Sequence, residues 1–233
     1  FKKWFGDSKM VDRNGKPRRF FHGTYKDIKE FKKGDDFKDT PLLAFFSPDV
    51  RFADEYAGGT ESAEYNPKTG GADIGGNIMP VYLKVENPFM YSNKGDAYRV
   101  ASVFHKRTGG LKMSPRFAWE LRLLSDEVMT KAQKKAVLPE QGGGGISRKA
   151  FAKLPVTQQK EILYKAVMTG EWGVLEDSTM SNVIQALGFD GIVIREAVKI
   201  WRKAKIGDHI RKKKIDVEPD NVAIFKPNQA KSV

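Results

Sequence analysis

The segment His22-Gly23-Thr24 offers side chains and backbone groups that can bind a polar ligand. It closes residues 20–25, a short apolar stretch that predicts a buried strand ending in polar residues. The imidazole of His22 supplies a ring donor or acceptor within reach of a sugar hydroxyl. Gly23 has no side chain, so its backbone N–H and C=O can approach a ligand amide closely, and Thr24 adds a hydroxyl. The alternative is that His22 is a satisfied core histidine at an ordinary strand end.

Two aromatic residues, Phe45 and Tyr56, can stack on a flat ring. Phe45 lies in the apolar run 43–46, which predicts a second short strand. Ser47 can cap a helix after this run, and Pro48 suits the first turn of that helix, from which Tyr56 would project. A heterocycle held between two rings gains roughly 1 kcal/mol per good aromatic contact beyond area burial. The alternative is that both rings belong to the core.

Four stretches near the two ends of the chain resemble the motifs of one known family. Residues 1–24 hold a Trp-Phe-Gly-Asp-Ser-Lys stretch, a Gly-x-Pro turn and a His-Gly-Thr strand, in that order. Residues 44–57 (AFFSPDVRFADEYA), 188–194 (GFDGIVI) and 225–233 (FKPNQAKSV) follow. The chain thus resembles the ADP-ribosyltransferase-like domain of phage and mobile-element polyvalent proteins, related to the poly-ADP-ribose polymerase and diphtheria-toxin-like group. Within this ordered set we favour a ligand-binding role for His22.

The resemblance implies NAD as the substrate and no metal. In such domains a His-Gly pair holds a ribose hydroxyl and the nicotinamide carboxamide. A tyrosine and a second aromatic residue clamp the nicotinamide ring, and a small residue faces the substrate. Matched to this sequence, the NAD-binding residues are His22, Gly23, Thr24, Phe45, Ser47 and Tyr56.

The sequence departs from the family at the catalytic acid. Polymerase-like relatives place a glutamate just before the last strand, where it holds a ribose hydroxyl and stabilises the oxocarbenium-like transition state. The match puts Asn221 at this position, and an amide can bond a hydroxyl but brings no charge. A one-residue bulge would bring Asp220 into the site, and Glu218 or Gln229 could also supply the polar group. The catalytic candidates are His22, Tyr56, Asn221, Glu218 and Asp220.

The formal net charge of +12 favours an anionic partner, such as nucleic acid, a dinucleotide or a membrane surface. Residues 199–215 (KIWRKAKIGDHIRKKKI) interleave apolar and basic side chains, a pattern that suits a strand or helix with one packed and one cationic face. The alternative is a solvated charged face that only keeps the chain in solution.

Several other classes of site are excluded. The glycine-rich stretches 70–76 and 142–145 lack a following Gly-Lys-Ser/Thr, so neither is a P-loop. The absence of cysteine excludes disulfides and thiol catalysis, and the three histidines lie too far apart for a zinc motif. No apolar run is long enough to span a bilayer.

The order of expected strands and helices predicts one α+β domain over residues 1–233. A mostly helical insertion is expected at about residues 95–178. Strands are expected at 20–25, 43–46, 79–85, 191–195 and 222–225, and helices from Ser114-Pro115 onward, at 157–169 and at 178–187. The resemblance implies two small, roughly perpendicular sheets that flank an NAD cleft, with the insertion beside it.

The resemblance further implies an NAD-dependent ADP-ribosyltransferase that cleaves the nicotinamide–ribose bond and modifies a macromolecule. Family context implies a bacterial host protein or nucleic acid as acceptor, after delivery by phage particles or mobile elements into the cytoplasm, and no membrane partner. Because the chain starts at Phe1, we expect it to be part of a larger polypeptide. Two alternatives stay open. One is a catalytically inactive binding module on the same fold, indicated by Asn221, and the other is a nucleic-acid-binding structural protein, indicated by the charge.

Overall fold

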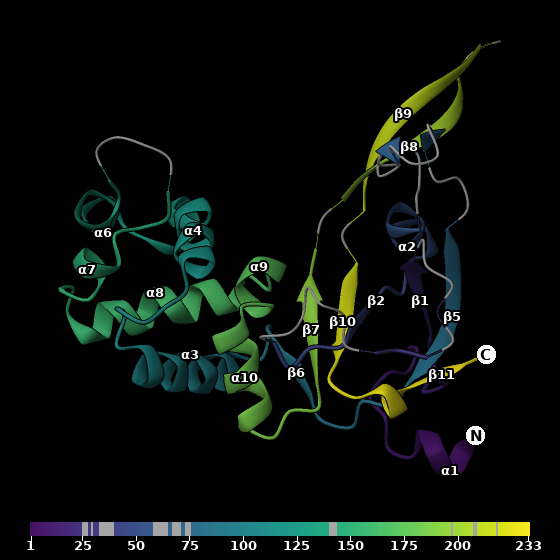
Figure 1. The fold of residues 1–233 in the computed structure, drawn as a ribbon, viewed down its shortest axis with the longest axis horizontal. Coiled ribbons are helices and arrows are strands. Elements are labelled where there is room, and N and C mark those ends of the chain that lie inside the picture. Colours follow the sequence, from purple (N-terminus) through teal and green to yellow (C-terminus); the bar gives the residue numbers. More distant parts are fainter. Residues whose placement is uncertain are drawn as a thin grey trace. The chain divides into compact units, whose positions relative to one another are not determined.

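Strands lie mainly toward the two ends of the chain in this computed structural model, and consecutive helices fill the stretch between Lys94 and Ala186 (Figure 1). Two compact units are present. Unit 1 comprises Phe1–Lys33, Leu43–Glu86 and Arg195–Val233, and unit 2 comprises Gly34–Leu42 and Asn87–Ile194. The structure describes residues 1–24, 28, 30–32, 40–57, 65–66, 71–72, 76–139, 144–196, 198–206, 209–217 and 219–233. For residues 65–66, 71–72, 198–206 and 209–217 it describes the backbone alone. Together the elements confirm the expected α+β class.

Unit 1 contains a three-stranded antiparallel sheet. Its strands are β1 (Arg19–Thr24), β5 (Asn77–Leu83) and β11 (Ala230–Ser232), in the order β1-β5-β11. The alternation expected around residues 79–85 holds, because Val81 and Leu83 are fully buried on one face of β5. The sequence reading did not anticipate β11.

The motifs at the two ends of the chain meet beside this sheet. Helix α1 (Lys2–Phe5) carries Trp4, whose Nε1 donates to the backbone oxygen of Asn228 at 3.0 Å. Buried Ser8 donates its Oγ to the carbonyl of Leu83 at 2.8 Å and accepts from the backbone N–H of Val85 at 3.1 Å. These contacts tie the N-terminal segment to the end of the central strand β5 and to the turn before β11, so the terminal motifs are explained by the fold.

A second strand pair in unit 1 leads into the helix that carries Tyr56. Strands β2 (Ala44–Phe46) and β10 (Asp220–Ile224) are antiparallel, with Val222 opposite Phe46 and Ala223 opposite Phe45. Helix α2 (Val50–Tyr56) follows β2.

The expected cap of this helix is wrong. Asp49, not Ser47, caps α2, and its Oδ1 accepts from the backbone N–H of Arg51 at 2.9 Å. The backbone of Ser47 is instead paired with Phe21, through hydrogen bonds of 2.8 Å in both directions. Ser47 is therefore still extended like a strand residue, and the helix begins only at Val50.

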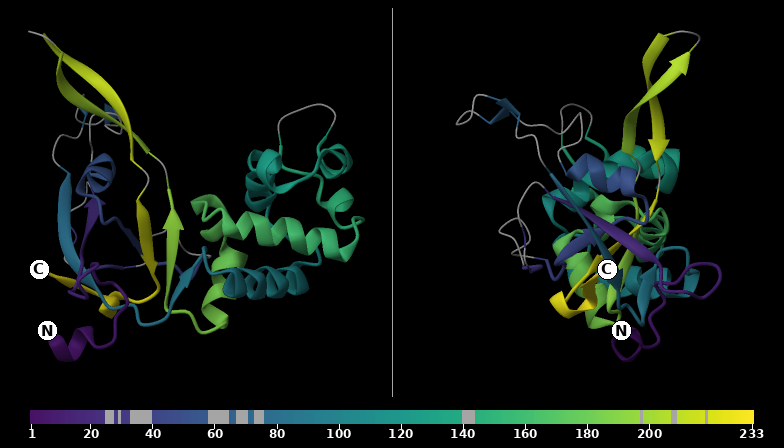
Figure 2. Two further views of the ribbon diagram at one scale, coloured as in Figure 1. Left: turned by 180° about the vertical axis from the view of Figure 1, so that it is seen from behind. Right: turned by 90° about the vertical axis from the view of Figure 1, so that its right-hand side faces the viewer.

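Two further strand pairs belong to unit 1. Strands β8 (Val198–Ile206) and β9 (His209–Val217) form an antiparallel pair with unbroken register, so the segment predicted as a strand or helix is a strand pair. Figure 2 shows it as a long two-stranded ribbon. Strands β3 (Tyr65–Asn66) and β4 (Gly71–Ala72) form a short antiparallel pair, and the other residues between 58 and 75 lie outside the described part of the chain.

Unit 2 is mostly helical. Strands β6 (Pro88–Met90) and β7 (Gly191–Arg195) pair in parallel. The helices are α3 (Lys94–Thr108), α4 (Pro115–Leu123), α5 (Ser125–Val128), α6 (Lys131–Val137), α7 (Arg148–Phe151), α8 (Val156–Met168), α9 (Trp172–Leu175) and α10 (Ser178–Ala186). Helices α4, α8 and α10 correspond to the predicted ones, whereas α3 was not expected. No described helix is long and apolar enough to cross a bilayer.

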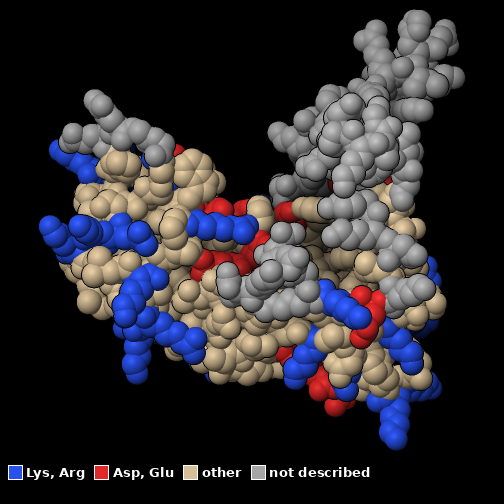
Figure 3. All heavy atoms as spheres, viewed as in Figure 1, with Lys and Arg blue, Asp and Glu red and all other residues tan. Residues whose placement is uncertain are grey.

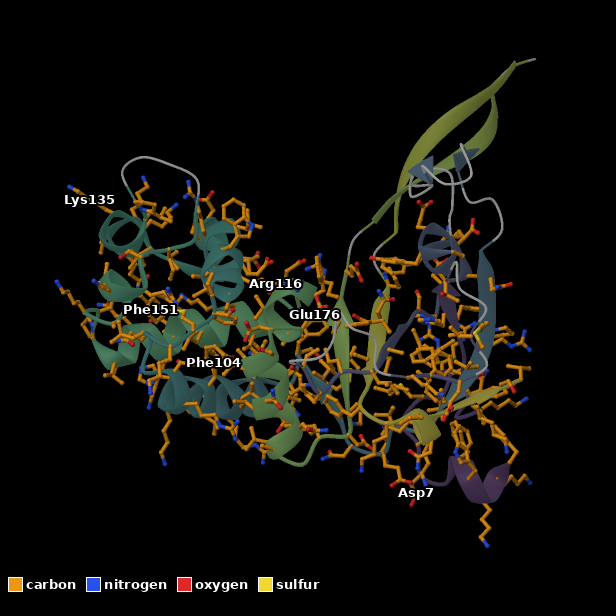
Figure 4. The ribbon with its side chains drawn as sticks, viewed as in Figure 1. Asp7, Phe104, Arg116, Lys135, Phe151 and Glu176 are labelled. Atoms are coloured by element: carbon orange, nitrogen blue, oxygen red, sulfur yellow. The ribbon has the colours of Figure 1, made fainter. Side chains whose placement is uncertain are left out.

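Aromatic packing and linked helix caps hold unit 2 together. The rings of Phe104 and Phe117 lie 4.6 Å apart, and Phe151 is fully buried among the helices (Figure 4). Ser114 caps α4 and donates its hydroxyl to Asp177, the residue that caps α10, at 2.5 Å. One hydrogen bond thus fixes the start of two helices.

Candidate functional site

His22 lies on β1 with its ring fixed by a backbone contact. Its Nδ1 lies 2.8 Å from the carbonyl oxygen of Phe45. A carbonyl only accepts, so this nitrogen carries the proton, and the neutral ring presents Nε2 as an acceptor. Burial lowers the pKa of His22, and the bond to Phe45 offsets part of that effect. His22 is therefore neutral at pH 7, and its Nε2 suits the hydroxyl of a ligand.

Aromatic rings surround the imidazole. The ring centroid of His22 lies 5.4 Å from that of Phe46 and 5.2 Å from that of Phe31. Phe31 and Phe46 are themselves in edge contact at 5.1 Å. This packing restricts the rotation of the imidazole and thereby holds Nε2 in one direction.

Gly23 brings the tyrosine-bearing helix onto the histidine-bearing strand. A Cβ on Gly23 would lie 1.7 Å from the carbonyl oxygen of Ala53 in α2. A Cβ on Gly76, beside β5, would likewise lie 1.2 Å from the carbonyl oxygen of Ala57. The backbone at Gly23 and Gly76 therefore packs directly on the backbone of α2 and its C-terminal cap. This contact requires glycine at position 23 for a reason other than the predicted approach of a ligand. Thr24 ends β1 opposite Asn77.

Tyr56 is joined to a carboxylate that the sequence reading missed. It is the last residue of α2, is 50% exposed, and rests on the ring of Phe52 at 5.4 Å. Its hydroxyl donates to Oε1 of Glu196 at 2.5 Å. Asn221 on β10 donates its Nδ2 to Oε2 of the same carboxylate at 3.2 Å. The structure thus brings two predicted site residues to one unpredicted acid.

Hydrogen bonds only partly offset the burial of the polar groups of Glu196 and Asn221. Burial raises the pKa of Glu196, and the hydrogen bonds from Tyr56 and Asn221 oppose this rise. Asn221 is 1% exposed, and its Oδ1 has no hydrogen-bond partner among the described residues. Buried polar atoms are normally paired, so an unpaired one calls for an explanation. Together the cluster presents acceptor oxygens that suit a sugar hydroxyl or a cationic carbon.

The remaining predicted residues have other positions. Phe45 contributes its carbonyl to His22, and its half-buried side chain alternates with the buried residues on either side of it. Ser47 is 3% exposed, and its Oγ accepts from the backbone N–H of Asp49 at 3.1 Å. Asp220 is exposed at the start of β10, on the strand face opposite to that of Asn221. Glu218 lies outside the described residues.

Gln229 serves the C-terminal turn. Its Oε1 accepts from the backbone N–H groups of Phe225 at 3.1 Å and Lys226 at 2.9 Å, and its Nε2 donates to the carbonyl of Lys84 at 3.2 Å. These bonds occupy the amide and assign it a structural role.

One sequence signal did point toward Glu196. It directly follows Gly191–Arg195, a strand whose first four residues are all buried. A charged residue at the end of a buried strand is well placed for a site, because the strand fixes its backbone. The family motif does not mark Glu196, because it places the acid just before the last strand.

Comparison with known proteins identifies the family of the chain. A family model described as ADP-ribosyltransferase in polyvalent proteins matches residues 12–233, which include His22, Tyr56, Glu196 and Asn221. No curated protein and no solved structure matches the chain. Since the matched range is nearly the whole sequence, the chain belongs to the family of ADP-ribosyltransferases in polyvalent proteins.

Proposed function

We propose that this protein transfers ADP-ribose from NAD to a macromolecule of a bacterial host. The observation that carries the proposal is the glycine-dependent contact between β1 and α2, which sets His22 and Tyr56 on two elements packed backbone to backbone. Family membership supports NAD as the substrate. A ligand-directed histidine and a half-exposed tyrosine on neighbouring elements are the groups that a ribose and a nicotinamide ring require.

The proposal gives each group one role. Nε2 of His22 accepts a hydrogen bond from a ribose hydroxyl, and the backbone of Gly23 and the hydroxyl of Thr24 lie next along the strand. The ring of Tyr56 stacks on the nicotinamide, with Phe45 as the second aromatic. Ser47 lies deeper and shapes the site through the start of α2.

The reaction breaks the bond between the ribose carbon and the nicotinamide nitrogen. Nicotinamide leaves with the electron pair, and positive charge develops on the ribose. An acceptor hydroxyl, amine, carboxylate or water then bonds to that carbon and loses a proton when it carries one. Groups that stabilise the charge lower the barrier, because they act more strongly in the transition state than in the bound substrate.

Labelled NAD tests the proposal directly. The full chain is incubated with NAD labelled in the adenylate portion and with a bacterial lysate. We expect label in one macromolecular fraction, removed by protease if the acceptor is protein and by nuclease if it is nucleic acid. His22→Ala should lose most of the labelling. The absence of both NAD binding and labelling would refute the proposal.

The substitution at position 221 favours one alternative, a binding module without turnover. That alternative predicts NAD binding with no release of nicotinamide. The nucleic-acid-binding structural role predicts salt-sensitive nucleic-acid binding with no effect of NAD. Measuring nicotinamide release separates both from the transferase.

A further inference from the structure

We infer that Glu196 is a catalytic residue and that it supplies, from the end of β7, the carboxylate that Asn221 does not provide from β10. The inference rests on the proposed function. It is carried by the two hydrogen bonds that place Glu196 between Tyr56 and Asn221.

Glu196 lies where an acid would act on the substrate. Oε1 of Glu196 meets the hydroxyl of the tyrosine proposed to stack on nicotinamide, at 2.5 Å. The carbon at which the nicotinamide bond breaks is directly attached to that ring. A carboxylate that contacts Tyr56 therefore lies beside the sugar on which positive charge develops. At the same time, Oε2 lies 3.2 Å from the Nδ2 of Asn221, so one carboxylate occupies the neighbourhood expected of an acid at position 221.

The negative charge of Glu196 is costly for the fold. Burying a carboxylate without a cation disfavours folding, and among the described contacts Glu196 is bonded to a hydroxyl and an amide. Glutamine at this position would keep the bond from Tyr56 and, after a flip of the Asn221 amide, would donate to Asn221 Oδ1, with no charge to desolvate. The fold therefore does not need the ionised group, whereas a reaction that creates positive charge does.

Beside Glu196, the Oδ1 of Asn221 is a second group that a substrate could engage. Its own Nδ2 is committed to Glu196, and Oδ1 has no partner among the described residues. A ribose hydroxyl would satisfy this atom. Asn221 then has two functions: it fixes Glu196 and accepts from the substrate.

In the reaction at the ribose carbon, Glu196 acts on both the cation and the attacking group. The carbon–nitrogen bond breaks, and nicotinamide keeps both electrons. Carboxylate Glu196 stabilises the ribosyl cation electrostatically and accepts the proton of the attacking hydroxyl or water as the new bond forms. The raised pKa of Glu196 makes it a better base for that proton. Release of the proton to solvent restores the carboxylate.

The test compares the full chain with Glu196→Gln. Nicotinamide release and NAD affinity are measured on both, with Glu86→Gln as a control because Glu86 is an exposed glutamate of unit 1. We expect Glu196→Gln to lose about 100-fold or more in turnover, the range seen when one stabilising group is removed from a charged transition state. Its NAD affinity should change by less than about threefold, and Glu86→Gln should match the wild type. Unfolding curves verify that each variant is folded.

A charge exchange supplies a second readout. In the double variant Glu196→Gln, Asn221→Glu, the carboxylate moves to the neighbouring position, and recovery of turnover supports the inference. Full turnover in Glu196→Gln overturns it while the transferase proposal stands. Wild-type protein that binds NAD but releases no nicotinamide also overturns it and leaves a binding module. Absence of NAD binding removes the proposed function itself.

Discussion

At the scale of single residues, His22 and Glu196 share one physical condition with opposite consequences. Burial disfavours the charged form of each, which lowers the pKa of the histidine and raises that of the glutamate. His22 therefore stays neutral and presents an acceptor nitrogen, while Glu196 becomes a stronger base. Perturbed pairs of this kind are frequent at functional sites.

Removing the imidazole tests the binding role. We expect His22→Ala to weaken NAD binding by roughly 1–3 kcal/mol, because a ligand hydroxyl loses its partner. Calorimetry measures this change. His105→Ala is the matched control, since His105 is bonded to Gln159 in unit 2. Unchanged affinity in both His22→Ala and Tyr56→Ala would show that NAD binds elsewhere.

Glu196 also makes a prediction about stability and pH. Its folded-state pKa is raised above the usual 4.5, so its contribution to stability is fully present below that pH. The contribution is lost as pH rises through the raised pKa. Glu196→Gln has no such loss, so its free energy of unfolding relative to wild type should be higher at pH 7.5 than at pH 4. Denaturant unfolding at the two pH values measures the difference, and a constant difference would contradict the pKa direction.

His22 has the reverse dependence. Its folded-state pKa is lowered below the usual 6.5, so its contribution to stability is present above that value and is lost as pH falls through the lowered pKa. Denaturant unfolding of His22→Ala and wild type at the same two pH values measures this contribution. The free energy of unfolding of His22→Ala relative to wild type should be lower at pH 7.5 than at pH 4, the reverse of Glu196→Gln.

At the scale of elements, the contact between β1 and α2 depends on Gly23. Gly23→Ala puts a methyl group 1.7 Å from the carbonyl of Ala53, so the helix must shift. We expect a loss of 1–3 kcal/mol or more in the free energy of unfolding, typical of overpacking, together with weaker NAD binding.

Gly95→Ala is the matched control. A Cβ on Gly95, in the first turn of α3, has only Asn93 Oδ1 within 4 Å, at 3.5 Å. Alanine favours helix over glycine by about 1 kcal/mol, so this variant should be as stable as wild type or more so. Equal losses in both variants would show that the tight contact at Gly23 is relieved without cost.

The sequence predicted elements better than the contacts between them. Alternation identified β5, and the glycines that follow the two helices, Gly170 and Gly188, marked the ends of α8 and α10, because these signals are local. The cap at Ser47 failed because its backbone pairs with Phe21, a contact 26 positions away in the sequence. Glu196 was missed for the same reason, since it meets Tyr56 across 140 positions. Long-range pairing leaves no periodic pattern, so the site could be predicted only where a family motif marked it.

At the scale of the whole molecule, two groups of positive charge offer a matched comparison. Basic side chains lie on the surface of the unit 2 helices (Figure 3), among them exposed Lys131, Lys135, Lys149 and Lys153. A second concentration in the sequence is Arg211-Lys212-Lys213-Lys214, within β9. Both groups remove four charges when changed to glutamine, so the pair separates local from overall charge.

We predict that a nucleic-acid acceptor depends on the β9 group. Changing Arg211, Lys212, Lys213 and Lys214 to glutamine should weaken nucleic-acid binding and flatten its dependence on salt, because fewer counterions are released. The same change at Lys131, Lys135, Lys149 and Lys153 should have less effect, and NAD binding should hold in both. Titrations at several salt concentrations provide the measurement. Labelling of protein alone, unaltered by the β9 change, would exclude a nucleic-acid acceptor.

The order in which unit 1 is assembled has a consequence for synthesis. Most of unit 2 is the continuous stretch Asn87–Ile194, whereas unit 1 needs its third stretch, which holds Glu196, Asn221 and β11. A ribosome adds roughly 5–20 residues per second, so the helices can fold while Tyr56 still lacks its carboxylate. Under the proposed function, the NAD site is then completed only after residues 220–232 have emerged. A nascent chain that has not yet formed β10 and β11 therefore lacks the proposed site.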